Sequence, residues 1–147
     1  MPNTNVHITV RSVQHFEGLE PERLEQQADA CLEKTPAGWT LTYEEAEEFG
    51  LGSTRTILEI GETRITLTRA GETRSQMVFQ TGQAHTSLYE TPYGKLPMTI
   101  RTLSLKADLT GEGGGIRIHY QIQLGNSPGG ETRLELTVRK KENRYDR

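Results

Sequence analysis

Apolar side chains alternate with polar ones at a period of two along most of the chain, and this alternation restricts the fold more than any other feature. In GIRIHYQIQL, every second residue is apolar or aromatic: Ile116, Ile118, Tyr120, Ile122 and Leu124. The residues between them are Arg, His and Gln. Such a pattern indicates a β-strand with one buried and one solvated face. We therefore expect a series of amphipathic strands.

The same alternation recurs on both sides of turn-like sequences. ETRLELTVRK follows the turn-rich GNSPGG, so the two C-terminal runs predict a hairpin. Gly61-Glu62 and Gly71-Glu72 stand between earlier runs at the spacing of tight hairpin connections. The remaining positions expected in the core are Val6, Ile8, Val10, Trp39, Leu41, Tyr43, Thr56, Leu58, Ile60, Ile65, Leu67, Met77, Phe79, Leu134, Leu136 and Val138.

Residues 22–34, ERLEQQADACLEK, fit two kinds of element. A helix would align Leu24, Ala28, Cys31 and Leu32, and the Glu, Gln and Ala content favours it. A strand would place the apolar residues on even positions, where only Gln26 interrupts the apolar face. On composition alone we expect the helix.

The stretch LPMTIRTLSLKADL contains a change of phase. Its first apolar residues fall on even positions, and those from Leu103 onward fall on odd ones. A slip of one residue within a long strand predicts a β-bulge or bend near Thr102. GEGGG, at 111–115, is expected to be a flexible hairpin turn.

Eight to ten short strands with short connections predict an all-β fold, namely an up-and-down antiparallel closed barrel. A two-sheet sandwich is the alternative. The 147 residues suffice for one core without disulfide or metal. We expect one domain, 1–147, with its core at about 5–141. The charged tail at 142–147 is expected to fray.

Charge and composition restrict the partners. With 17 Lys and Arg against 20 Asp and Glu, the net charge of −3 does not favour nucleic acid, and no apolar run is long enough to cross a bilayer. The first residues, MPNTNVHITVRS, do not resemble a signal peptide, and Cys31 is the single cysteine, so we expect a cytoplasmic protein. The four His show no metal-ligand spacing, so neither a metal nor a cofactor is expected.

Three stretches of the chain carry a family resemblance: LTYEE at 41–45, RAGETRSQMVFQTGQAHTSLYETPYGKLPMTIRT at 69–102, and GGIRIHYQIQL at 114–124. An Arg-x-Gly turn, a Met-x-Phe strand, a Gly and a Tyr-x-Thr-x-Tyr-Gly turn follow in order. The chain thereby resembles the YwiB-like family of uncharacterised bacterial β-barrel proteins, domain of unknown function 1934. The resemblance implies a closed, calycin-like barrel and a strand at 22–34. It implies no activity and no catalytic residue.

Even and odd positions of a strand face opposite sides of the sheet, and this alternation places a polar cluster at one end of such a barrel. If the strands run up and down in order, the third, fifth and seventh strands end at the same mouth of the barrel at which the fourth, sixth and eighth strands begin. In the AHTSLYE run we expect Ala84 and Leu88 to point inward and His85 and Tyr89 to point outward. The polar residues expected at the mouth are Glu45, Arg69, Thr73, Ser75, Glu90 and Tyr93.

Three functions fit this mouth. We expect a barrel that binds a small ligand or a partner, with these six residues as the ligand site. The alternative is a structural or protein-interaction module whose filled barrel is tied by an ion-pair network of Arg69 with Glu45, Glu90 or both. A hydrolase using the polar mouth comes third, because the sequence supplies no activated nucleophile and hence no catalytic residue.

Overall fold

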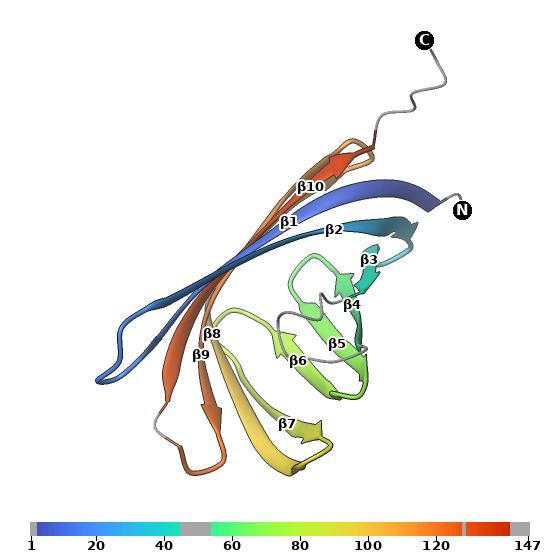
Figure 1. Cartoon of the computed structure of the whole chain (residues 1–147). Helices are drawn as coiled ribbons and strands as arrows, with labels where there is room; N and C mark the ends of the chain where they lie inside the picture. The colour runs from blue at the N-terminus through green and yellow to red at the C-terminus, as the bar shows by residue number, and fades with distance from the viewer. Residues whose placement is uncertain (1–2, 45–53, 128, 142–147) are drawn as a thin grey trace.

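The structure, a computed structural model, describes residues 3–44, 54–127 and 129–141, which form ten antiparallel strands (Figure 1). No helix in these ranges has the length and apolarity to cross a membrane. The strands are β1 (Asn3–Phe16), β2 (Glu22–Thr35), β3 (Gly38–Glu44), β4 (Thr54–Ile60), β5 (Ile65–Gly71), β6 (Ser75–Phe79), β7 (Ala84–Thr91), β8 (Gly94–Thr110), β9 (Gly113–Leu124) and β10 (Gly130–Lys140).

The strands form one sheet in the order β6-β5-β4-β3-β2-β1-β10-β9-β8-β7. Each strand therefore pairs with its neighbours in sequence, except that β6 and β7 form the two edges of the sheet, and β1 also pairs with β10, for example through Ile8 and Val138. This is the predicted up-and-down barrel. β2 pairs with β1 from Glu22 to Glu33, so the strand implied by the family resemblance is confirmed and the helix expected from composition is wrong. Pairing with β1 along the segment, and with β3 from Cys31 to Thr35, outweighs its helix propensity.

The barrel is nearly closed, and the gap in its pairing lies between β6 and β7. Across this seam, the main chains of Arg74 and Glu90 exchange two hydrogen bonds of 2.8 Å. The hydroxyl of Ser87 donates a third bond to the main-chain oxygen of Gln76. No other hydrogen bond joins the two strands within the described residues.

The interior confirms the predicted alternation. Phe79 is fully buried and its ring lies 4.9 Å from that of Tyr120, centroid to centroid. All eight residues predicted for the two C-terminal strands are buried or packed against the core. The buried apolar residues are Val6, Ile8, Ala30, Leu32, Leu41, Tyr43, Leu58, Ile60, Ile65, Leu67, Met77, Phe79, Met98, Ile100, Ile116, Ile118, Tyr120, Leu136 and Val138.

The predicted bulge is confirmed, because the register between β8 and β9 shifts between Thr102 and Ser104. The GEGGG turn is shorter than expected. Only its first two residues connect the strands, and β9 begins at Gly113. Gly114 has φ +144° and lies so close to the main-chain oxygen of Asp108 that a Cβ atom would not fit. Close strand approach, rather than turn flexibility, therefore explains this glycine.

Candidate functional site

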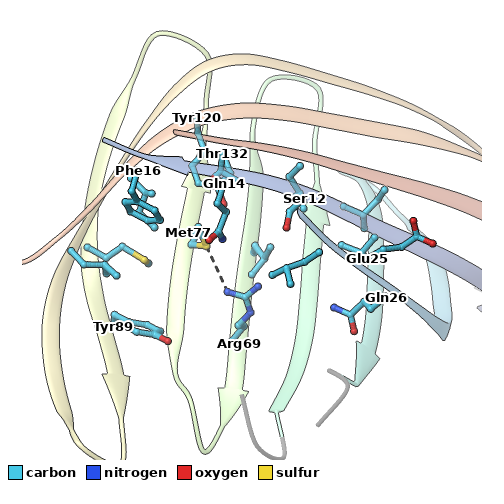
Figure 2. A pocket seen from close by; sticks show the side chains of 18 of the residues that line it. Ser12, Gln14, Phe16, Glu25, Gln26, Arg69, Met77, Tyr89, Tyr120 and Thr132 are labelled. Carbon is cyan, nitrogen blue, oxygen red and sulfur yellow. Dashed lines mark hydrogen bonds between the residues drawn. The ribbon is translucent and has the colours of Figure 1, made fainter. Parts of the chain in front are cut away.

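A cavity of about 290 Å³ occupies one end of the barrel. The β1–β2, β5–β6, β7–β8 and β9–β10 turns lie at this end, in the lower part of Figure 1, whereas both chain ends lie at the other. Its walls are mostly apolar and aromatic. The lining residues are Val10, Ser12, Gln14, Phe16, Leu24, Glu25, Gln26, Tyr43, Leu67, Arg69, Met77, Tyr89, Met98, Tyr120, Ile122, Leu124, Thr132, Leu134 and Leu136 (Figure 2).

Arg69 places a positive charge in this cavity, as its parity predicted. It lies near the end of β5 on the face of the buried Leu67, and its Nη1 lies 4.0 Å from the Sδ atom of Met77 (Figure 2). Arg69 is the single cationic side chain among the described residues that line the cavity. The carboxylate of Glu25 accepts a 2.9 Å hydrogen bond from Nε of Arg11 on the outer face.

Tyr120 forms part of the inner wall of the cavity. Burial raises the pKa of its hydroxyl, while the nearby charge of Arg69 and a hydrogen bond with Thr132 act in the opposite direction. Burial is the largest of the three effects. Tyr120 is therefore a neutral group that the field of Arg69 reaches.

Thr73 and Ser75 also point inward as predicted. Both are buried, at 5% and 6% exposure, and Ser75 lies directly opposite Arg69 in the β5–β6 register. The hydroxyl of Ser75 is buried and has no hydrogen-bond partner among the described residues. Buried hydroxyls in folded proteins nearly always have a partner, but neither Ser75 nor Thr73 is among the residues that line the cavity.

The inward placement of Glu90 and Tyr93 is wrong. Glu90 lies on the outer face, where its Oε1 is 3.3 Å from Nζ of Lys95, and Tyr93 at the hairpin tip is 98% exposed. The predicted Arg69–Glu90 pair is therefore not formed. Glu45, the other predicted partner of Arg69, lies outside the described residues.

The error at Glu90 comes from the phase of β7. Tyr89, expected outside, lines the cavity, and Leu88, expected inside, is 50% exposed. The register explains why: Ser87 lies opposite Met98, which is buried, so the odd-numbered residues of β7 face inward. Pairing with β8, rather than the weak apolar pattern of AHTSLYET, decides the phase.

Several residues that line the cavity were not predicted, although the sequence carried a signal for them. Ser12, Gln14 and Phe16 continue the even phase of Val10 along β1, beyond the point where the apolar run stops. Gln26, the residue that interrupts the apolar face of β2, also lines the cavity. Polar interruptions of an inward face thus mark this site.

The described residues do not include a group of three or more His, Cys, Asp or Glu that could hold a metal ion. The cavity instead combines a guanidinium, amides, hydroxyls and apolar walls. Such a combination suits a small organic molecule that carries a negative group.

The comparisons with known proteins agree with the β-barrel fold described above. The family described as Domain of unknown function (DUF1934) matches residues 8–136. The "Uncharacterized beta-barrel protein YwiB" of Bacillus subtilis (strain 168) is 31% identical to this chain over 80 residues. These residues cover 54% of this chain and 56% of that protein, so the sequence match spans little more than half of either. The crystal structure of the ywiB protein from Bacillus subtilis superimposes with a TM-score of 0.86 at 24% identity, covering 95% of this chain and 94% of that chain. This structural likeness concerns the fold alone.

Proposed function

The chain belongs to the DUF1934 family of unknown function, and we propose that the mouth of its barrel binds one small molecule with an apolar body and an anionic group. The observation that carries the proposal is the position of Arg69 in a largely apolar cavity of about 290 Å³. This volume is close to the lower end of small-molecule sites, roughly 300 Å³. The size favours a compact ligand over an extended lipid chain.

The polar groups around Arg69 support an anion in particular. A guanidinium presents several donors in one plane and matches a carboxylate, sulfonate or phosphate. The side-chain amide of Gln14, which lines the same cavity, supplies a further donor. Tyr89, Phe16 and Leu67 offer apolar surface to the rest of the ligand.

The test uses 1-anilinonaphthalene-8-sulfonate, a fluorescent probe with aromatic rings and one sulfonate. We expect saturable binding by the folded protein and a dissociation constant at least about tenfold higher for Arg69→Met, since a charge-assisted hydrogen bond contributes about 1.5–3 kcal/mol. Arg69→Lys keeps the charge but not the fork of donors, so its affinity should lie between the two. Circular dichroism confirms that each variant is folded.

Arg55→Met is the matched control. Arg55 lies on β4 next to β5, but on the outer face, where its Nε donates a 2.8 Å hydrogen bond to Glu44. Its substitution should leave probe binding unchanged. Equal affinities of Arg69→Met and the wild type for the probe would contradict the proposal. Binding of the probe to the unfolded protein but not to the folded protein would contradict it too.

A protein-interaction module is the second candidate, and exposed apolar residues on the β7–β8 hairpin favour it. Leu88 is 50% exposed, Leu96 46% and Tyr93 98%. The same probe separates the two functions. Binding that is lost in a Leu88→Ser, Tyr93→Ser double variant but kept in Arg69→Met would favour an exposed docking patch over the cavity.

A further inference from the structure

A second hollow, of about 600 Å³, lies on the outer surface of the long strands β1, β2, β8, β9 and β10. We call it the outer groove. Arg11, Arg23, Arg117 and Arg133 all line it, together with apolar groups such as Val13. The β-bulge that ends at Ser104 borders this groove. It is separate from the barrel mouth, because these arginines occupy the opposite face of the sheet from Arg69.

In one row of residues across the groove, the charges are balanced by ion pairs within the row. Glu25, Arg11, Glu135 and Arg117 lie directly opposite one another on β2, β1, β10 and β9. Arg11 lies 2.9 Å from Glu25 and 3.8 Å from Glu135, and Arg117 lies 3.1 Å from Glu135. The two carboxylates of this row therefore already have arginine partners.

The adjacent row has no such balance. Arg23, Val13, Arg133 and His119 follow one another across the same four strands. Within residues 3–44, 54–127 and 129–141, neither Arg23 nor Arg133 forms a salt bridge. Nε2 of His119 is buried and lies 3.3 Å from Glu131, but without the geometry of a hydrogen bond.

The register also places like charges together at this groove. Lys106 on β8 lies directly opposite Arg117 on β9, and Arg133 has no carboxylate directly opposite it, since Val13 and His119 occupy those positions. Cations in directly opposed positions destabilise an antiparallel pair. A sheet arranged for stability alone would place a carboxylate at one of them, so an anion from outside the chain would offset this repulsion.

We propose that the outer groove binds a molecule carrying two or more linked phosphoryl groups. Arg23 and Arg133 are two strands apart, about 9–10 Å between their main chains, and their long side chains can converge on one diphosphate above Val13. Each guanidinium matches the oxygens of one phosphoryl group. Two linked phosphoryl groups present more oxygens and more negative charge to the two guanidiniums than a single phosphate does, and this difference provides the selectivity.

Calorimetric titration with inorganic pyrophosphate tests the site at low ionic strength. We expect the full chain to bind pyrophosphate more tightly than orthophosphate, and we expect affinity to fall as salt is added. The Arg23→Gln, Arg133→Gln double variant should bind at least about tenfold more weakly, since two charge-assisted interactions are lost. Both side chains are exposed, so the fold should be retained.

Two controls make the result specific. Arg55→Gln removes an outer-face arginine of β4 that pairs with Glu44, and Arg69→Met removes the arginine of the mouth. Both should bind pyrophosphate like the wild type. Unchanged affinity in the double variant, loss of affinity in Arg69→Met, or absence of binding by the wild type would each overturn the proposal. Tighter binding of a single-stranded RNA through the same two arginines would overturn it in favour of a nucleic-acid surface.

Discussion

At the scale of single residues, Tyr120 connects the core to the cavity. Its ring packs on Phe79, and it lines the same cavity as Arg69 and Thr132. Its alternation within GIRIHYQIQL predicted the burial, but no sequence pattern indicated the proximity of Arg69. That proximity depends on β5 and β9 facing each other across the barrel, which only the closed sheet determines.

Tyr120 should make the fold sensitive to alkaline pH. Its pKa in the folded state is raised, chiefly by burial, whereas an unfolded tyrosine ionises near pH 10. The contribution of neutral Tyr120 to the free energy of unfolding is therefore fully present below about pH 10. It is lost as the pH rises from the tyrosine pKa of the unfolded chain towards the raised pKa of Tyr120 in the folded protein. Denaturant melts from about pH 8 to about pH 11 should show this loss, and Tyr120→Phe should reduce it.

Tyr93→Phe is the control for this measurement, because Tyr93 is 98% exposed at the hairpin tip. Its alkaline loss of stability should match that of the wild type. An equally steep loss in Tyr120→Phe would show that another group governs the alkaline limit.

At the scale of elements, the comparison of β9 with β7 explains what the sequence could predict. β9 alternates five apolar or aromatic residues with polar ones, and its phase was predicted correctly. β7 has one large apolar residue, Leu88, and one Tyr, so its own pattern is ambiguous. The two-residue turn at Pro92-Tyr93 would have resolved it, since such a turn sets Ser87 opposite Met98.

The β6–β7 seam should be the first part of the barrel to open. Its two strands share one pair of main-chain hydrogen bonds and the Ser87–Gln76 bond, whereas β9 pairs along its length with β8 and β10. In hydrogen exchange, peptides covering Ser75–Phe79 and Ala84–Thr91 should therefore exchange before those covering Gly113–Leu124.

Ser87→Ala should accelerate exchange in β6 and β7 further, because it removes the side-chain bond across the seam. Thr86→Ala is the matched change. Thr86 bonds Thr99 at 2.9 Å on the β7–β8 side, so its loss should leave exchange in β6 unchanged. Equal effects of the two substitutions on β6 would show that the Ser87 bond does not hold the seam.

At the scale of the whole molecule, strand number and short connections predicted the up-and-down barrel with a two-sheet sandwich as the alternative, and the family resemblance favoured the closed barrel. The position of the seam was not predictable in this way. A barrel of ten strands has ten possible junctions, and the position of the one with the fewest hydrogen bonds, between β6 and β7, depends on where the two edges of the whole sheet meet. Sequence-local patterns do not contain that three-dimensional constraint.

The position of the seam also means that the chain could begin and end elsewhere. The first and last strands are neighbours, with the amide of Lys141 bonded to the carbonyl of Asn5 at 3.1 Å. A circular permutant that joins these ends through a short linker and opens the chain between Gln80 and Gln83 would turn the sheet into a linear meander from β7 to β6. The β1–β10 pairing, non-local in the natural order, would become local. Because lower contact order favours faster folding, stopped-flow refolding should be faster for this permutant than for the natural order. It should also be faster than for a permutant opened at the β4–β5 turn, where the β4–β5 pairing would become non-local.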